Sequence, residues 1–278
     1  MMKKTINFYS DLADERISAS NSKIMGEQTY SGKYGLKKFE FTVKKEDEKV
    51  LGKSAGNYVT INCSKLLAHL TRVQDYVAKE VAYALRKFIL STTNKKNPFV
   101  LVVGLGNGGM VADSLGVKVA ENLLITHGMP EFAREELGDL SAIIPGVGGC
   151  TGIATYDIIA GVCEKVKPDV VIAIDKLTAY DYSRLGCSFQ MSDTGITPGA
   201  GVGNATRVLN KKSLGLPVIA LGVPMMISGF GICDKASDEM AERVFAPKEV
   251  DILTYKCART LSMSINLAVH GKVYKDYC

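Results

Sequence analysis

Apolar and polar positions follow two clear periods in the first third of this 278-residue chain. Residues 66–90 place apolar side chains three and four positions apart, which predicts an amphipathic helix. Residues 37–43 alternate instead, with Phe39, Phe41 and Val43 on one face, and residues 58–61 form another β-rich stretch. We therefore expect an antiparallel flap over about 36–62. Residues 1–30 are polar and weakly patterned, so little independent structure is expected there.

From residue 99 onward, short apolar runs alternate with helical patterns. These patterns predict strands over 99–104, 141–145, 170–175, 188–192 and 216–222, and helices over 114–127, 152–166 and about 248–270. The run Val-Val-Ile-Ala-Ile that precedes Asp175 is typical of a strand buried on both faces. The predicted fold class is α/β, with a mostly parallel central sheet flanked by helices and an N-terminal antiparallel β flap. The core is expected over about 66–278.

Two of these strands lead to a carboxylate. The first continues through the loop Gly106-Asn107-Gly108-Gly109 to Asp113, and the other stops at Asp175. Ligands of open parallel sheets bind outside the carboxyl ends of the strands, so both acids are expected at one edge. The sequence therefore predicts a paired-acid site. Taken separately, Asp113 is also a good N-cap for the helix that follows, and Asp175 a good turn former.

The glycines before Asp113 also satisfy a dinucleotide fingerprint, Gly104-x-Gly106-x-x-Gly109. In that motif a pyrophosphate lies at the N-terminus of the helix, where this chain has the negative side chain of Asp113. Nucleotide binding is therefore the weaker interpretation.

A second glycine-rich loop follows the strand predicted at 188–192. Its Asp193-Thr194-Gly195 matches the active-site turn of pepsin-like proteases, but those enzymes pair two such turns in an all-β frame. The glycines Gly199, Gly201 and Gly203 indicate a loop whose backbone approaches something closely, and plain turn chemistry would explain them too. Backbone amides of this loop or of residues 106–109 are candidates to bind a developing oxyanion.

Composition narrows the remaining function classes. With 46% hydrophobic and 23% charged residues, the chain has enough apolar material for a full core. No apolar stretch approaches the roughly 20 residues of a membrane span, and we expect a cytoplasmic protein. The 7 cysteines are never spaced Cys-x-x-Cys and the 3 histidines follow no metal-ligand spacing, so neither a disulfide framework nor a metal site is expected. The net charge of +5 comes partly from lysines interleaved with acids near the N-terminus, which argues against nucleic-acid binding.

Many short motifs, in order along nearly the whole chain, resemble those of the germination protease family of spore-forming bacteria. They are Gly56-x-Tyr58-Val-Thr60, Val102-Val-Gly-Leu-Gly-Asn107, Asp113-x-Leu-Gly116, Glu121-Asn-Leu-Leu-Ile-Thr126, Ile144-Pro-Gly-Val147, Thr151-Gly-Ile153, Ile172-Ala-Ile-Asp175, Ser192-Asp-Thr-Gly-Ile196, Gly201-Val-Gly-Asn204, Leu216-Pro-Val-Ile-Ala220 and Pro247-Lys-Glu-Val-Asp251.

The resemblance implies an atypical aspartic endopeptidase that cleaves small acid-soluble spore proteins during germination. It implies a fold like that of hydrogenase-maturation proteases, a homotetramer in the spore core or forespore, and two essential aspartates that fall on Asp113 and Asp175. No cofactor is implied. The family is made as a zymogen, and Ser10-Asp11-Leu12-Ala13-Asp14-Glu15 resembles its processing site. We therefore expect a propeptide over 1–11, cleavage between Asp11 and Leu12, and a single peptidase domain over 12–278.

The chain also departs from the family pattern. The region between Gly222-Val-Pro224 and Pro247 is short and omits a long segment found in typical members of the family. In addition, Met110-Val-Ala112 stands where the family usually has Val-Thr-Pro before the first aspartate. Lys176 puts a cation beside Asp175, which favours Asp175 as the ionised partner. Two alternatives stay open: a hydrogenase-maturation-like, metal-dependent endopeptidase, and a non-catalytic homologue that binds a protein or a small ligand.

Overall fold

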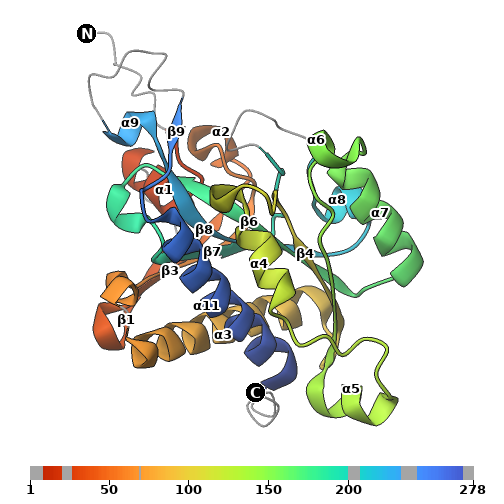
Figure 1. The fold of residues 1–278 in the computed structure, drawn as a ribbon. Coiled ribbons are helices and arrows are strands. Elements are labelled where there is room, and N and C mark those ends of the chain that lie inside the picture. Colours follow the sequence, from red (N-terminus) through yellow and green to blue (C-terminus); the bar gives the residue numbers. More distant parts are fainter. Residues whose placement is uncertain (1–8, 21–26, 69, 200–206, 233–242, 272–278) are drawn as a thin grey trace.

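The computed structural model describes residues 9–20, 27–68, 70–199, 207–232 and 243–271. These residues form one nine-stranded sheet with helices on both faces (Figure 1). The strands are β1 (Gln28–Ser31), β2 (Lys37–Val43), β3 (Gly56–Asn62), β4 (Phe99–Gly104), β5 (Asp139–Ile143), β6 (Val170–Ala179), β7 (Ser188–Ser192), β8 (Val218–Ser228) and β9 (Val244–Phe245).

The helices include three long ones. These are α3 (Thr71–Thr93), α7 (Thr155–Val166) and α11 (Val250–His270). Shorter helices are α1 (Ala13–Ser20), α2 (Glu48–Leu51), α4 (Leu115–Glu121), α5 (Glu131–Leu137), α6 (Gly148–Thr151), α8 (Lys211–Leu214) and α9 (Gly229–Ile232). Single 3-10 turns are η1 (Lys33–Gly35), η2 (Ser64–Ala68), η3 (Val111–Asp113) and η4 (Tyr182–Arg184).

The strand order is β1-β2-β3-β7-β8-β6-β4-β5, and β9 pairs with β8. The pairs β8-β6, β6-β4 and β4-β5 are parallel. The pairs β1-β2, β2-β3, β3-β7, β7-β8 and β8-β9 are antiparallel. The predicted α/β class with an antiparallel N-terminal part is therefore confirmed. The N-terminal strands do not stand apart as a flap, because β3 pairs with β7 and extends the central sheet.

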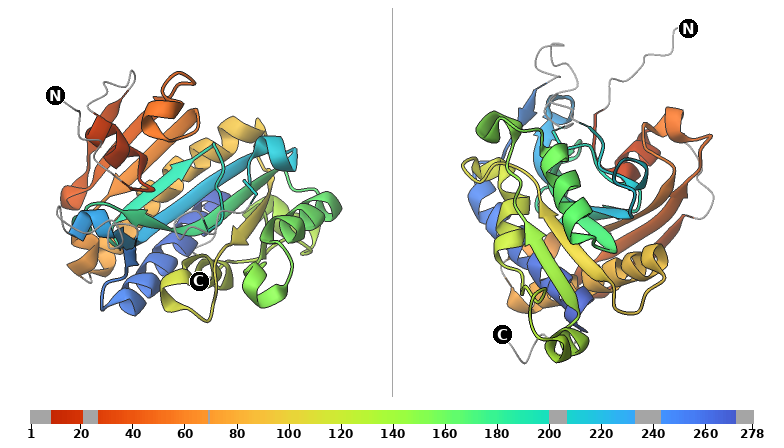
Figure 2. Two further views of the ribbon diagram at one scale, coloured as in Figure 1. Left: turned by 90° about the horizontal axis from the view of Figure 1, so that it is seen from above. Right: turned by 90° about the vertical axis from the view of Figure 1, so that its right-hand side faces the viewer.

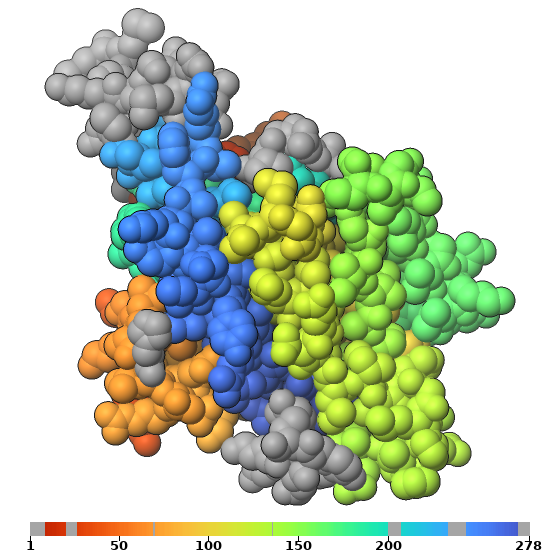
Figure 3. All heavy atoms as spheres, in the orientation of Figure 1, coloured from red at the N-terminus to blue at the C-terminus, as the bar shows by residue number. Residues whose placement is uncertain are grey.

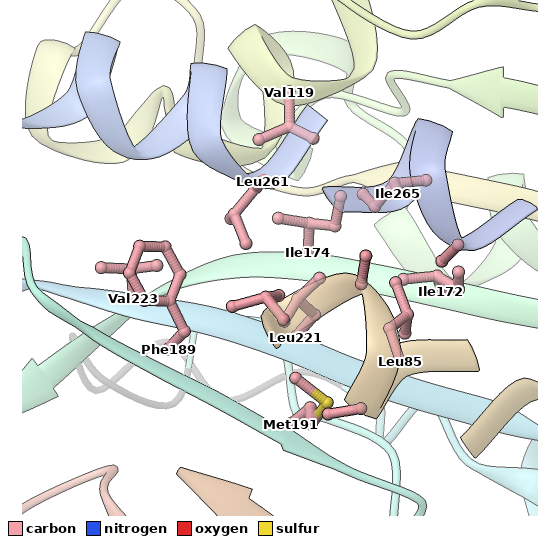
Figure 4. Packing of buried hydrophobic residues seen from close by; sticks show 14 of the residues in the cluster. Leu85, Val119, Ile172, Ile174, Phe189, Met191, Leu221, Val223, Leu261 and Ile265 are labelled. Atoms are coloured by element: carbon pink, nitrogen blue, oxygen red, sulfur yellow. The ribbon is translucent and has the colours of Figure 1, made fainter. Parts of the chain in front are cut away.

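Apolar side chains on one face of the sheet form the main core with α3, α4 and α11. In that core Ile172 and Ile174 of β6 and Leu221 of β8 pack against Leu85 of α3 and Leu261 of α11 (Figure 4). Figure 3 shows α11 and α4 side by side on the outer surface of this layer. Alternation along the strands then sends the neighbouring residues to the opposite face.

That opposite face is covered only at its two sides. Near β4 and β6, Tyr156, Ile159 and Cys163 of α7 form a second apolar cluster with the strands. Near β2 and β3, a third cluster contains Ala13 and Ile17 of α1. Figure 2 shows α1 (red) and α7 (green) apart from each other on this face of the curved sheet, with strands between them. The middle of this face is where the predicted site residues lie.

Several predicted boundaries differ from the observed ones. The helix expected over 114–127 ends at Glu121, and the strand expected over 170–175 continues to Ala179 because β8 keeps pairing with it beyond Asp175. Residues 13–20 and 28–31, where little structure was expected, form α1 and β1. Helix α1 gains its stability from packing, since Ala13 and Ile17 are buried against the sheet.

Candidate active site

Asp175 lies inside β6 rather than after it. It pairs with Gly222 of β8, and Gly222 pairs in turn with Gln190 of β7. Residues paired in this way project to the same face of a sheet, so Asp175 and Gln190 flank a position that has no side chain. A Cβ at Gly222 would lie 2.7 Å from Cγ of Leu177 and 2.8 Å from the backbone oxygen of Asp175. Because Gly222 has no side chain, that of Leu177 packs directly over β8, on the face that lies between α1 and α7.

Asp113 reaches the same region from the loop that follows β4. It ends the turn η3, and its carboxylate forms an ion pair with Lys176, the residue after Asp175. The charge of Asp113 also contributes to raising the pKa of Asp175, as expected for two acids within interaction range. The structure thus brings together the two acids that the sequence singled out, although 62 positions separate them in the chain.

The backbone of residues 106–109 folds around Asp113. The amide of Asn107 donates to Oδ2 of Asp113 at 2.9 Å and to its backbone oxygen at 3.1 Å. Gly106 has a φ of +110°, and a Cβ there would lie 2.0 Å from the backbone oxygen of Asp113. Only glycine fits at this position. Asp113 does not cap α4, because the helix starts after Ser114 and the carboxylate accepts from the loop instead.

The two carboxyl groups have different surroundings. Asp175 is 8% exposed, whereas the Asp113 side chain meets the Lys176 ammonium and is 16% exposed. Burial raises the pKa of Asp175 to about 7, with Lys176 opposing the rise and Asp113 adding to it. The sequence had favoured Asp175 as the ionised partner, but the Lys176 side chain turns to Asp113. Asp175 is therefore the acid whose protonated form burial favours.

The other loop candidates lie in less direct positions. Asp193 accepts from the backbone and side-chain amides of Asn57, at 2.8 and 2.7 Å, and so ties the end of β7 to β3. The amide of Gly109 donates to Oδ1 of Asn107 at 2.9 Å. With Asn107 and Gly109 amides engaged inside the loop, only Gly106 and Gly108 are left there as backbone candidates. Gly199 has a φ of +75°. Gly201 and Gly203 lie outside the described residues.

The predicted processing site crosses the same face of the sheet. The Asp11 amide donates to the backbone oxygen of Thr178 at 2.8 Å, and the Thr178 amide donates to Oδ2 of Asp11 at 2.8 Å. Leu12 is fully buried and packs against Leu177 and Ala179. The bond between Asp11 and Leu12 is therefore held over the part of β6 that follows Asp175.

The acids after Leu12 are held as well. Asp14 pairs with Arg184 and accepts from Thr60 at 3.2 Å. Glu15 accepts from the amides of Tyr180 and Asp181, at 2.8 and 3.0 Å. Each acid of the segment therefore meets donors from β6, from the two residues that follow it, from η4 or from β3.

Two residues that touch this segment were not singled out from the sequence. Lys53 and Gln190 both donate to the backbone oxygen of Asp11. Gln190 carries a weak signal, since it is a polar residue in the middle of an otherwise buried strand. Lys53 is one of many lysines near the N-terminus, and nothing in the local sequence separates it from the others.

Residues 8–244 match the family model described as germination protease. This chain belongs to the germination protease family. The germination protease of Geobacillus sp. (strain WCH70) is 45% identical over 212 residues, which are 73% of this chain and 56% of that protein. The germination protease of Caldanaerobacter subterraneus subsp. tengcongensis is 36% identical over 234 residues, 83% of this chain and 71% of that protein. The chain spans little more than half the length of the Geobacillus relative.

Among solved structures, the chain is similar to the crystal structure of a NiFe hydrogenase maturation protease, HycI from Thermococcus kodakarensis KOD1. The TM-score is 0.35 at 17% identity, over 62% of this chain and 96% of that one. In the described part of this member of the germination protease family, no helix has the length and apolarity needed to cross a membrane. Nor do three or more His, Cys, Asp or Glu side chains gather within the described ranges as a group suited to a metal ion.

Proposed function

We propose that this chain is an endopeptidase that cleaves small acid-soluble spore proteins during germination. It is made as a zymogen that removes residues 1–11 by cutting its own chain between Asp11 and Leu12. Asp113 and Asp175 carry out the hydrolysis as a general base and a general acid. We further propose that it works as a homotetramer in the spore core or forespore, as membership of the family implies.

One observation supports the proposal above the others. The bond between Asp11 and Leu12 lies on the face and strand that carry Asp175, with the Asp11 backbone bonded to Thr178 and Leu12 buried against Leu177. A peptide bond held beside two interacting carboxyl groups is the arrangement that peptide hydrolysis by an aspartic pair requires. The acids on either side of the bond also meet complementary donors, which suits substrates that carry acids at the same positions.

The surroundings of the two acids assign their roles in this mechanism. Asp113, paired with the Lys176 ammonium, takes a proton from a water molecule as the water oxygen attacks the carbonyl carbon of the scissile bond. Asp175, whose pKa is raised to about 7, donates its proton to the leaving nitrogen. The two groups interact, so a pH profile reports the titration of the pair.

Mass spectrometry of the purified protein over time tests the proposal. We expect the first eleven residues to disappear at a rate that is independent of protein concentration, because each chain holds its own processing site in place. Asp113→Asn and Asp175→Asn should both retain the N-terminus and fail to cleave a peptide that contains Ser-Asp-Leu-Ala-Asp-Glu. Glu164→Gln, which neutralises an exposed acid on α7, is the matched control and should behave as the unsubstituted protein.

Two results would contradict the proposal. Normal cleavage by both aspartate variants would remove Asp113 and Asp175 from the mechanism. A protein that never processes its N-terminus and never cleaves the peptide would instead fit the non-catalytic alternative.

A further inference from the structure

Two side-chain donors from distant parts of the chain meet at one backbone oxygen, that of Asp11. Nζ of Lys53 lies 2.7 Å from this oxygen, and Nε2 of Gln190 lies 2.9 Å from it. It is the carbonyl of the bond that the proposed self-cleavage would break. A neutral peptide carbonyl is satisfied by amide donors, so a lysine ammonium at this place calls for an explanation.

Each donor is fixed by its surroundings. Oε1 of Gln190 accepts from the amide of Ala13 at 2.6 Å, which orients the amide group so that its NH2 faces Asp11. Gln190 is also level with Asp175 across Gly222, so the donor and the acid approach the segment from the same face. Between them Leu177 packs over Gly222, and Leu12 of the segment packs against Leu177.

Lys53 follows Gly52, the glycine that caps the C-terminus of α2, and its ammonium reaches Asp11. The charged groups that face its ammonium are Asp11 and Asp14, which favour the charged form, and Arg16, which opposes it. Arg16 is itself held, since Nε donates to the backbone oxygen of Ser10 at 2.5 Å and Nη1 to that of Leu51 at 3.2 Å. Burial is the largest effect and lowers the pKa of Lys53 to about 8. An ammonium removed from water is costly unless a negative charge forms beside it.

We propose that Lys53 and Gln190 bind the oxyanion that forms on the carbonyl of the residue before the scissile bond. The inference rests on the proposed function and adds two residues to it. The water oxygen bonds to the Asp11 carbonyl carbon, its proton passes to Asp113, and the π electrons of the carbonyl move to the oxygen, which Lys53 and Gln190 hold. The electrons then return, the bond to the Leu12 nitrogen breaks, and that nitrogen takes the proton of Asp175. The products are a carboxyl group on Asp11 and an amine on Leu12.

Steady-state cleavage of the Ser-Asp-Leu-Ala-Asp-Glu peptide by the full chain tests this inference. Lys53→Met removes the charge and keeps the length of the side chain, and Gln190→Glu replaces the donor but keeps the acceptor for Ala13. Each variant should lower kcat by about 100-fold, the loss typical of one oxyanion donor, while KM stays within about threefold. Lys53→Arg keeps a cation and should recover most of the rate. Lys49→Met, at an exposed lysine of α2, is the matched control and should be unchanged.

The pH profile separates an oxyanion donor from a merely structural lysine. In the unsubstituted protein, log kcat/KM should fall with a slope of one above the pKa of Asp175, about 7, and with a slope of two above that of Lys53, about 8. Lys53→Arg should keep the slope of one throughout, because an arginine does not lose its proton in this range.

Either of two results would overturn the inference alone. The first is that kcat is unchanged in both Lys53→Met and Gln190→Glu while Asp175→Asn is inactive. The second is that log kcat/KM falls with the same slopes against pH in the unsubstituted protein and in Lys53→Arg. Absence of any cleavage by the unsubstituted protein would overturn the proposed function and this inference together.

Discussion

Asp175→Asn should make the protein more stable near neutral pH. The folded state buries this carboxyl and raises its pKa from the ordinary 3.8 to about 7. Protonation therefore favours the folded state, and folding stability is lost as the pH rises from about 4 to about 7. An asparagine carries no charge to bury, and its oxygen can still accept the 2.8 Å hydrogen bond from the Lys176 amide.

The size of the effect follows from the interval between the two pKa values. That interval is about three pH units, and each unit corresponds to about 1.4 kcal/mol, so the free energy at stake is about 4 kcal/mol. We expect Asp175→Asn to gain stability of this order over the unsubstituted protein at pH 8. At pH 4 the gain should be absent, because aspartic acid is then neutral in the folded state too.

Urea denaturation at pH 4, 6 and 8 measures the difference. Both proteins are measured before processing, and mass spectrometry confirms that each still carries residues 1–11. Glu164→Gln removes one exposed carboxylate from α7 and controls for the change in net charge. Equal stability of Asp175→Asn and the unsubstituted protein at pH 8, with the same dependence on pH, would refute the raised pKa and the acid role that rests on it.

Three further predictions concern the surroundings of the site. Lys176→Met removes the cation that opposes the raised pKa of Asp175, so the alkaline limb of the kcat/KM profile should move to higher pH and the maximal rate should fall. A limb at the same pH would count against Asp175 as the general acid. Gly106→Ala should unfold the loop or cost several kcal/mol, since its Cβ would meet a backbone oxygen at 2.0 Å, whereas Gly149→Ala, which meets nothing within 4 Å, should leave the melting temperature nearly unchanged. Arg184→Met leaves Asp14 without its ion pair, so hydrogen exchange of residues 9–20 should quicken; unchanged exchange would show that the pair does not hold the segment.

The fold could be predicted best where one pattern dominates a whole element. The bounds 99–104 and 188–192 match β4 and β7, because both runs are apolar or half-apolar and end in glycine or polar turns. Helix α1 was missed because its short sequence, with Asp14, Glu15 and Arg16 in its first half, has a weak apolar stripe. Its packing against β2 and β3 stabilises it, and no local pattern encodes that contact.

The candidate site could be predicted only in part, for a similar reason. Asp113 and Asp175 each end or interrupt an apolar run, and such a position can be recognised in one dimension. The direction of the Lys176 side chain cannot be recognised in this way. The sequence analysis therefore placed the Lys176 charge beside Asp175, its neighbour in the chain, whereas the ammonium pairs with Asp113. Lys53 and Gln190 can be recognised as site residues only through their contacts to Asp11. In the chain, Asp11 lies more than 40 positions from Lys53 and more than 170 positions from Gln190.

The contacts of Asp11 have a consequence for what the protein can act on. Thr178 binds both the amide and the carboxylate of Asp11, and Lys53 and Gln190 bind its backbone oxygen. Inside a helix the backbone amides and oxygens are bonded to one another, so a helical residue has none to offer to such partners. Under the proposed function, a target must therefore present its scissile residue outside regular secondary structure, and partners that fold or coat that stretch would shield it from attack without touching the protein.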